Sequence, residues 1–191
     1  WFHFNEEDRW SLFHSYAFDF SVWEIWGALL YGGELVIIPY NVSRSPIDFL
    51  QWLAEKKITV LNQTPSAFYQ LMTVDKEHPE LSEKLALRYI VFGGEALNLT
   101  RLQEWYDRHP VDAPTLINMY GITETTVHVS YLALNEELSK SQANSLIGTA
   151  IPDLNIYVLD GQLKPVPPGV VGEMYVSGEG LAQGYLNQAS L

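Results

Sequence analysis

Apolar runs of four to six residues alternate with longer, helix-like segments over the first two thirds of the chain. These runs are rich in β-branched and aromatic residues, and they predict strands at 11–16, 34–38, 58–61, 87–92 and 115–118. Helices are expected at 22–30, from the Ser45-Pro46 start onward, at 65–72 and at 100–109, with a polar connection at 75–83. This alternation predicts an α/β fold, with a mostly parallel sheet and flanking helices. In such sheets ligands bind beyond the carboxyl ends of the strands.

The pattern changes after residue 131. Residues 135–145, NEELSKSQANS, are polar and predict a surface loop. The runs at 155–159 and 173–176 are β-rich and are separated by a Pro/Gly turn cluster, which is typical of antiparallel strands. We therefore expect an α/β part at 1–135, followed by a small antiparallel β unit at 136–191.

The composition narrows the class of protein. A hydrophobic content of 47% indicates a packed globular chain. The formal charge of −12 disfavours phosphate backbones and anionic lipids, and no apolar run approaches the ~20 residues of a membrane span, so we expect no nucleic acid and no membrane as partner. The absence of cysteine excludes a disulfide framework and a thiolate metal site, and it fits a cytoplasmic location. The start, WFHFNEEDRW, has no Met and no signal-peptide pattern, so we expect a central piece of a longer protein.

The tetrapeptide Gly93-Gly94-Glu95-Ala96 follows a predicted strand and precedes a predicted helix. Glycines at this place let a flat ligand such as a nucleotide base lie against the backbone without meeting a Cβ atom. A tight turn between strand and helix explains the same residues equally well. The spacing matches neither a dinucleotide fingerprint nor a Walker loop, so no phosphate cradle is predicted here.

Residues 118–124, NMYGITE, begin where a strand is expected to end. Tyr120 offers a face for stacking, and Asn118 can bind an amine edge. Thr123 can reach a phosphate, and Glu124 can hold Mg²⁺ through oxygen. Each residue alone has an ordinary explanation, since a Tyr usually lies in a core and a Glu is usually solvated. Their order within one short stretch is the informative feature.

Asp19 lies between aromatic residues in FDFSVWE, residues 18–24. A carboxylate in apolar surroundings is costly unless it is paired, so it predicts a cation such as a ligand ammonium. A helix cap is the alternative and, from these residues alone, the favoured one: Asp19 or Ser21 would cap the helix that follows. No metal-ligand spacing is present, and we predict no structural metal; satisfied or exposed imidazoles are expected for His3, His14, His78 and His109.

Longer blocks carry a resemblance to a known family: FDFSVWEIWGALLYGGELVIIP at 18–39, NMYGITETT at 118–126 and GEMYVSGEGLAQGYLNQASL at 172–191. Together with GGEAL at 93–97, they make the whole chain closely resemble an adenylation domain of a nonribosomal peptide synthetase, one of the adenylate-forming enzymes. The resemblance implies activation of an amino acid with ATP to an aminoacyl-adenylate and pyrophosphate. The acyl group then passes to the phosphopantetheine thiol of a carrier domain. Carrier domain and adjacent synthetase modules are thus the implied partners.

The resemblance also implies a nucleotide site. It puts adenine against Tyr120 and the backbone of residues 94–96, with Asn118 at the exocyclic amine and Gly121 in the same nucleotide-binding stretch. Thr123 would contact the α-phosphate of ATP or AMP, and Glu124 would hold Mg²⁺, so these two residues are the expected catalytic ones. Ile122 stands where the family usually has proline. The cofactor-binding residues are thus Gly94, Glu95, Ala96, Asn118, Tyr120, Gly121 and Thr123.

The amino-acid pocket is implied in the same way. Asp19 would pair with the α-ammonium of the substrate, an assignment that overrides the cap interpretation. Trp23 leaves room for a short side chain, and Asn62 and His128 offer hydrogen bonds, which fits a hydroxyl. The set resembles the family's threonine code with one Ile-to-Val difference, so L-threonine is expected. Its members are Asp19, Phe20, Trp23, Asn62, Val91, Gly93, Met119, Val127 and His128.

Several parts of the family pattern are missing from these residues. The phosphate loop would lie upstream, and the ribose-binding Asp, the hinge and the C-terminal lobe with its Lys would lie downstream. We therefore expect the 191 residues to be nearly inactive by themselves. An acyl- or aryl-CoA synthetase of the same superfamily is one alternative, which Asp19 disfavours because an acyl chain carries no cation. A non-catalytic module that binds nucleotide or amino acid is the other.

Overall fold

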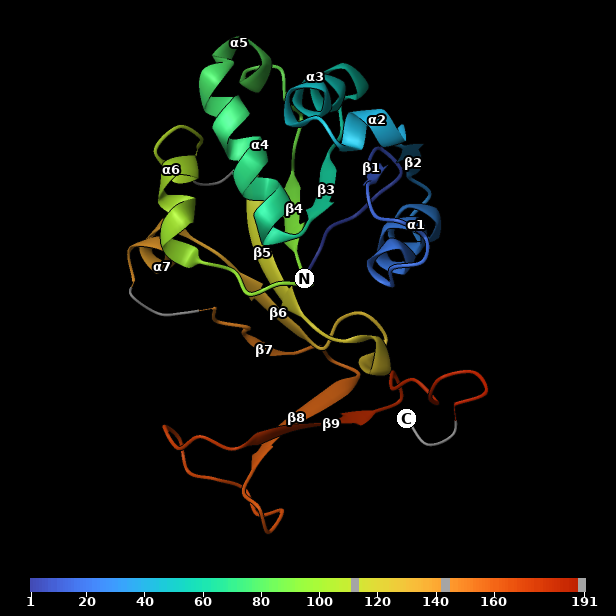
Figure 1. Ribbon diagram of the computed structural model, residues 1–191, viewed down its shortest axis with the longest axis vertical. Coiled ribbons are helices and arrows are strands. Elements are labelled where there is room, and N and C mark those ends of the chain that lie inside the picture. The colour runs from blue at the N-terminus through green and yellow to red at the C-terminus, as the bar shows by residue number, and fades with distance from the viewer. Residues whose placement is uncertain (111–113, 142–144, 189–191) are drawn as a thin grey trace.

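The computed structural model describes residues 1–110, 114–141 and 145–188, and its centre is a seven-stranded sheet of order β2-β1-β3-β4-β5-β6-β7 (Figure 1). Five strands are parallel: β1 (Arg9–Leu12), β2 (Glu34–Ile37), β3 (Val60–Gln63), β4 (Tyr89–Phe92) and β5 (Thr115–Tyr120). At one edge β6 (Ser130–Ala133) and β7 (Thr149–Ala150) continue the sheet with antiparallel pairing. The predicted α/β fold with a mostly parallel sheet is confirmed.

Helices cover both faces of this sheet. Neighbouring residues of a strand point to opposite faces, so Leu61 and Ile90 pack against α3 (Pro46–Lys56) and α4 (Pro65–Glu77), while Val60 and Val91 face the side of α1 (Phe20–Leu30). Shorter helical segments complete the chain: α2 (Tyr40–Ser43), α5 (Pro79–Ser82), η1 (Leu99–Leu102), α6 (Gln103–Tyr106), η2 (Thr123–Thr125) and α7 (Glu136–Lys140). The strands are thereby buried on both sides, as their apolar sequences require.

The chain reverses its direction of progress across the sheet between β1 and β3. From β1 it moves by α1 to β2, which lies on one side of β1; from β3 it moves by α4 to β4 and on to β5, on the other side. Ligands of open parallel sheets bind at such a reversal, beyond the carboxyl ends of the strands. The loops that follow β1, β3, β4 and β5 meet there.

A separate two-stranded antiparallel sheet ends the chain. β8 (Leu154–Leu159) pairs with β9 (Glu173–Gly178) over the full length of both strands, and Figure 1 shows the pair beyond the edge of the main sheet. The predicted small antiparallel unit is thus confirmed. The boundary at residue 135 stays a prediction; the main sheet continues to Ala150, and the second sheet begins at Leu154.

Several predicted elements need correction. The strand expected at 11–16 is β1 at Arg9–Leu12, because Trp10 and Ser11 are the buried residues that pair with β2. The helix expected at 100–109 is the 3₁₀ turn η1 followed by α6, and the Asn98 side chain caps it by accepting from the Thr100 N–H. The polar connection expected at 75–83 holds the end of α4 and then α5.

The predicted surface loop at 135–145 is also wrong in part. Residues 136–140 form α7, because the Asn135 side chain caps the helix by accepting from the Leu138 N–H at 2.8 Å. Residues 142–144 of that loop lie outside the described residues. Strands β6 and β7 were not expected from the sequence. In the described part of the chain, no helix has the length and apolar character needed to cross a membrane.

Candidate active site

Two cavities adjoin each other beyond the carboxyl ends of the strands. The Tyr120 cavity, of about 410 Å³, is lined by residues 94–96 and by Asn118 and Tyr120. The Asp19 cavity, of about 240 Å³, is lined by Asp19, Phe20, Thr123, Glu124 and His128. Gly94, Gly121 and Ile122 line both. The structure therefore brings the residues expected at the nucleotide next to the carboxylate expected at the amino acid.

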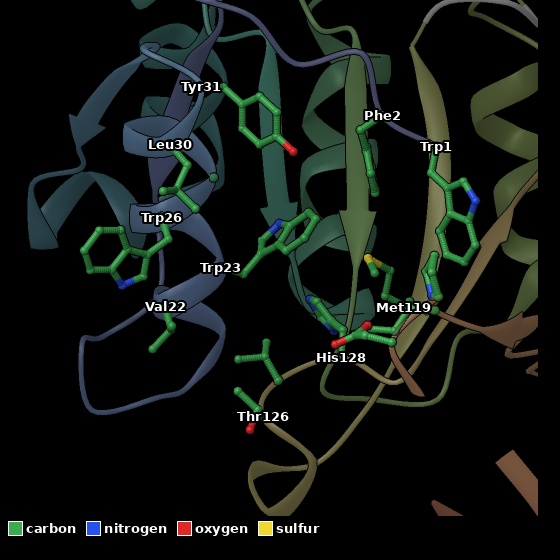
Figure 2. A pocket seen from close by; sticks show the side chains of 15 residues that line it. Trp1, Phe2, Val22, Trp23, Trp26, Leu30, Tyr31, Met119, Thr126 and His128 are labelled. Carbon is green, nitrogen blue, oxygen red and sulfur yellow. The ribbon is translucent and has the colours of Figure 1, made fainter. Parts of the chain in front are cut away.

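A third and larger cavity, the Trp23 cavity, has a volume of about 630 Å³ and lies on the α1 side of the sheet (Figure 2). Trp23 extends from α1 toward Met119 and His128, with Trp1 and Phe2 on the far side. His128 lines both this cavity and the Asp19 cavity, as does Val127. Val127 and His128 thus stand where these two cavities meet, while Phe20 lines the Asp19 cavity and Met119 the Trp23 cavity. The other expected pocket residues, Asn62, Val91 and Gly93, are not among the residues that line either cavity.

Asp19 makes a contact that its place in the sequence does not predict. It occupies the N-cap position of α1, yet its side chain makes no capping hydrogen bond, so the cap interpretation is wrong. Its Oδ2 instead accepts a hydrogen bond from the Thr123 hydroxyl at 2.7 Å, across 104 positions of sequence. The first turn of α1 is closed by backbone bonds from Ser21 to Phe18 and from Val22 to Asp19. The carboxylate therefore lines the cavity and does not cap the helix.

The backbone of residues 118–128 makes a compact hairpin-like connection. A Cβ atom on Gly121 would lie 2.0 Å from the carbonyl oxygen of Val127, so glycine is required where the two arms pass. The Thr125 hydroxyl accepts from the Ile122 N–H and donates to the Ile122 carbonyl, which closes the 3₁₀ turn η2. Thr123 and Glu124 are consequently exposed at the tip of the turn, beside Asp19.

Strained backbone follows this turn. Thr126 and Val127 both have positive φ, at 55° and 72°, and a β-branched residue such as valine rarely adopts that conformation. The His128 N–H closes the turn by donating to the Thr126 carbonyl at 3.0 Å. Strain of this kind persists only where the surrounding structure imposes it, and it is common at ligand sites. Here it directs the His128 side chain into the interior.

His128 is buried and surrounded by rings. It meets Phe20 edge-on at 5.0 Å and Trp23 at 5.3 Å between ring centroids. A Cβ on Gly93 would lie 3.2 Å from both His128 Cε1 and Phe20 Cε1, which is closer than an ordinary contact. Glycine at position 93 therefore lets the two rings keep their positions. Burial, reinforced by repulsion from His14, lowers the pKa of His128 to about 3, and the ring is neutral at physiological pH. Neither ring nitrogen has a partner among the described residues.

Asn62 lies on β3 next to Val91 on β4 and is completely buried. The Trp23 indole N–H donates to its Oδ1 at 2.8 Å. Because an indole nitrogen can only donate, this bond fixes which end of the amide is oxygen. The Nδ2 group is left without a partner among the described residues. A buried donor of this kind is costly unless a ligand or water meets it.

The Tyr120 cavity is bordered by backbone as well as side chains. Gly94 has a φ of 79°, which favours glycine, and the neighbouring Glu95 turns its carboxylate to the Ser66 N–H at 3.0 Å and the Ser66 hydroxyl at 2.9 Å. The turn interpretation and the ligand interpretation of residues 93–96 are therefore compatible. Asn118 donates through Nδ2 to the Leu146 carbonyl at 2.7 Å, which holds its amide at the cavity wall.

The comparisons with known proteins agree with this geometry. A family profile described as AMP-binding enzyme matches residues 1–186. The chain belongs to the AMP-binding enzyme family. Over its whole length it is 64% identical to a dimodular nonribosomal peptide synthase of Bacillus subtilis (strain 168), and the match covers 8% of that protein. Over 98% of its length it is also 48% identical to syringomycin synthase SyrB1 of Pseudomonas syringae pv. syringae, and this match covers 30% of that protein.

A solved structure supports the same assignment of fold. The crystal structure of CmiS6 matches 97% of this chain with a TM-score of 0.86 and 30% identity, over 44% of its own length. This AMP-binding enzyme chain thus spans less than half the length of each of these three relatives. The expected kinship with adenylation domains of nonribosomal peptide synthetases is confirmed.

Glu124 is the residue of this AMP-binding enzyme expected to hold Mg²⁺. The Tyr185 hydroxyl donates to its Oε1 at 3.0 Å, and the Ala182 N–H donates to its backbone carbonyl at 3.0 Å. Among the described residues, no group of three or more His, Asp or Glu side chains could by itself hold a metal ion. Mg²⁺ commonly uses one or two carboxylates together with substrate phosphates, so a single exposed carboxylate at the cavity mouth fits it.

Sequence reasoning missed some residues of this site. Tyr185 and Ala182 approach Glu124 from the segment after β9, and no local pattern links Tyr185 to a residue 61 positions away. Glu24 was also missed, and its side chain is buried beside the start of α1. The expectation of a satisfied or exposed imidazole is wrong for His14: its ring is buried against Phe20, and neither ring nitrogen has a hydrogen-bond partner among the described residues. A signal for Glu24 was present, because the carboxylate stands within the apolar run VWEIW.

Proposed function

We propose that this chain takes part in the ATP-dependent activation of an amino acid. A carboxylate oxygen of the amino acid attacks the α-phosphorus of ATP and forms an acyl–phosphate bond. The bond between the α-phosphorus and the oxygen that bridges to the β-phosphate breaks, and pyrophosphate leaves with the electron pair. The observation that carries the proposal is the 2.7 Å hydrogen bond between Thr123 and Asp19, in a cavity that adjoins the Tyr120 cavity. The groups proposed to bind the two substrates are thus within one hydrogen bond of each other.

Asp19 is the proposed partner of the α-ammonium. Its carboxylate is partly buried beside Phe18 and Phe20, where an unpaired charge would be costly. An ionised carboxylate has about four acceptor sites, and the described residues use one of them through Thr123, so capacity for an ammonium remains. Acids without an amine offer no cation to this site, which favours amino acids over acyl or aryl acids.

The Tyr120 cavity is the proposed site for the nucleotide. The Tyr120 ring would stack on adenine, and the backbone of residues 94–96 would border the base. The bond from Asn118 Nδ2 to Leu146 leaves Oδ1 to accept from the exocyclic amine. Thr123 would donate to the α-phosphate, which requires its hydroxyl to be shared with Asp19 or released from it.

Glu124 is the proposed Mg²⁺ ligand, and the ion would neutralise charge on the phosphate oxygens. Thr123 and Glu124 share the exposed tip of η2, so one rigid turn would present both groups to the triphosphate. Tyr185 donates to the same carboxylate and so restricts its rotamer. The chain's own contribution to the reaction is then orientation of the phosphate and of the attacking carboxylate.

L-Threonine is the proposed amino acid. The side-chain hydroxyl of threonine is both a donor and an acceptor. Asn62 offers only its Nδ2 donor, because Trp23 occupies Oδ1, and the neutral ring of His128 offers a nitrogen lone pair. A hydroxyl that accepts from Asn62 Nδ2 and donates to His128 would satisfy the amide donor and the acceptor nitrogen of the ring. Valine has the same shape but would leave them unpaired, and sites built to bind a hydroxyl reject such analogues strongly.

Transfer to a carrier domain is the proposed second step. The thiol sulfur of phosphopantetheine attacks the acyl carbon of the adenylate, the bond to AMP breaks, and the thiol loses its proton. The nonribosomal peptide synthases that match this chain support carrier domains and neighbouring modules as partners. The absence of cysteine fits a reducing compartment, and we propose the cytoplasm.

Pyrophosphate exchange tests the proposal. The assay chain is a complete adenylation domain that carries residues 1–191, in its parent polypeptide or in place of the matching segment of the Bacillus subtilis synthase. Exchange is measured with each proteinogenic amino acid, with fatty acids and with aryl acids. We expect exchange to depend on an amino acid and to be fastest with L-threonine. Exchange with a fatty or aryl acid alone would indicate a CoA synthetase, and binding of threonine without exchange would indicate a non-catalytic module.

The 191-residue chain alone is the second arm of this experiment. We propose that it is nearly inactive, because it carries no phosphate loop and no C-terminal lobe lysine. Exchange by the short chain at the rate of the complete domain would contradict that part of the proposal.

A further inference from the structure

Glu24 is a completely buried carboxylate that the proposed reaction does not use. It lies on α1 directly after Trp23, and its exposed fraction is 0%. Its Oε1 accepts from the Phe13 N–H at 3.2 Å, and its Oε2 accepts from the His14 N–H at 3.1 Å. His14 Nδ1 also lies 3.2 Å from Oε1, at ion-pair distance, although the contact is too bent for a regular hydrogen bond. Burial raises the pKa of Glu24, and these contacts with His14 and Phe13 oppose that shift.

The carboxylate holds the start of the loop that carries Asp19. Residues 13–19 connect β1 to α1, and the middle of this loop is exposed. Its backbone bonds are local, such as the one from the Phe18 N–H to the Ser15 carbonyl at 2.8 Å. Glu24 anchors the loop at Phe13 and His14, and Thr123 holds it at Asp19. The loop is therefore tied to the rest of the fold at both ends by side chains.

His14 links this anchor to the wall of the site. Its ring stacks on Phe20 with 4.4 Å between centroids and 19° between planes. The edge of Phe18 meets the same ring at 5.4 Å. Phe20 in turn meets His128 edge-on at 5.0 Å. His14 thus packs against the two phenylalanines that flank Asp19.

We infer that Glu24 is a positioning residue for the amino-acid site: by binding the N–H groups of Phe13 and His14, it fixes the loop and the ring stack that aim Asp19 at the substrate ammonium. A buried carboxylate is expensive, and an apolar residue at position 24 would remove that cost. The hydrogen bonds from two loop N–H groups offset part of the free energy that burial of the carboxylate costs. The inference rests on the proposed role of Asp19.

Kinetics of the Glu24→Gln variant test the inference in the complete adenylation domain. Glutamine keeps the size of the side chain, but it has a single acceptor oxygen and no charge, so one loop N–H loses its partner. We expect the KM for threonine to rise about tenfold, since a hydrogen bond to a charged group is lost at the loop. The KM for ATP should stay within about twofold, because none of the residues that line the Tyr120 cavity belongs to this loop.

Asp8→Asn is the matched control. Asp8 is also completely buried, and it accepts from a backbone N–H, that of Asn5 at 3.1 Å, and from Thr59 and Arg88. It precedes β1, whereas the Asp19 loop follows β1, so it lies at the opposite end of the sheet. Asp8→Asn should lower the melting temperature as Glu24→Gln does, without a selective rise in the threonine KM. Equal effects of both variants on the threonine KM would reduce Glu24 to a purely structural role and overturn the inference.

A second pair of variants covers the case in which Glu24→Gln does not fold. His14→Ala removes the ring behind Phe20, while His14→Phe keeps a ring there; both keep the backbone N–H that Glu24 accepts. We expect a raised threonine KM for His14→Ala and a value close to wild type for His14→Phe. Unchanged threonine KM in both would contradict the inference. Failure of the proposed function is distinguishable, because in that case Asp19→Ala itself would leave exchange intact.

Discussion

Polar groups are treated differently at the two ends of the proposed amino-acid site. At the Asp19 end, formed by Asp19, Thr123 and Glu124, the side chains are partly or fully exposed and are bound to one another or to Tyr185. At the His128 end, formed by Trp23, Asn62 and His128, the amide and the imidazole are buried and carry nitrogen atoms with no partner among the described residues.

The difference follows from what each end has to bind. The substrate ammonium and the phosphates are charged and hydrated. The protein groups that bind them can therefore remain solvent-exposed and exchange hydrogen-bond partners. A neutral hydroxyl contributes little unless it meets groups that have already been removed from water. We therefore expect the Asp19 end to control whether any amino acid reacts, and the His128 end to control which one.

Asp19→Ala should have the largest effect. Removing the carboxylate that pairs with the substrate ammonium should reduce exchange on the order of 10³-fold with every amino acid, while ATP binding is retained. Pyrophosphate exchange across the amino acids measures the first part, and fluorescence titration with ATP measures the second. Survival of exchange with any amino acid would show that another group meets the ammonium.

His128→Phe should change selectivity rather than overall rate. Phenylalanine keeps the ring contacts with Phe20 and Trp23 but cannot accept a hydrogen bond from the substrate. We expect the ratio of kcat/KM for threonine over valine to fall about a hundredfold. His78→Phe, at an exposed ring that pairs with Glu80, is the control and should leave the ratio unchanged. An unchanged ratio in His128→Phe would remove this residue from the proposed pocket.

Local pattern was sufficient for most of the fold. The Ser45-Pro46 start gave α3 because Ser45 Oγ accepts from the Asp48 N–H and proline takes the first turn. The apolar runs before Gln63 and Gly93 gave β3 and β4 because both faces of those strands are buried. β6 escaped prediction because its buried first residue is Ser130, whose hydroxyl donates to the Ile147 carbonyl at 2.6 Å, a contact that no local pattern shows.

The sequence predicted which residues belong to the proposed site better than it predicted the hydrogen bonds between them. Resemblance put Asp19 and Thr123 in one site, but the hydrogen bond between them joins residues far apart in sequence and had to be seen in the fold. The bond from Trp23 to Asn62, which fixes the amide, is of the same kind. Burial of Glu24 also depends on tertiary packing, because the helical period alone cannot say which polar position turns inward.

His128 also predicts a pH dependence of stability. The unfolded chain binds a proton at an ordinary pKa near 6.5, whereas the folded ring titrates at about 3, so between these values the unfolded state holds more protons. The free energy of unfolding should therefore fall as the pH drops below about 6.5, by about 2 kcal/mol at pH 5.

Denaturant unfolding of the complete domain at several pH values checks this contribution. The His128→Phe variant should lose it, while other titrating groups, Glu24 included, act equally in both chains. The difference between wild type and variant should thus change on acidification, with the wild type losing more stability than the variant. A difference that does not change with pH would mean that His128 binds its proton equally well in the folded and the unfolded chain, so that its pKa is not lowered by folding.

Trp23→Phe should have the smallest of these effects, and it isolates the orientation of Asn62. Phenylalanine keeps an aromatic wall beside His128 but loses the N–H that donates to Asn62 Oδ1 at 2.8 Å. The amide can then turn, and it no longer presents only a donor to the substrate hydroxyl. We expect the preference for threonine over valine to fall about tenfold, with kcat for threonine changed little, because the Asp19 end is untouched.

A second substitution, Asn62→Ala, should then add less to Trp23→Phe than it costs in the wild type, since the two residues act through one hydrogen bond. Full additivity of the two changes would mean that Asn62 faces the substrate without help from Trp23, and the contrast between the two ends would rest on His128 alone.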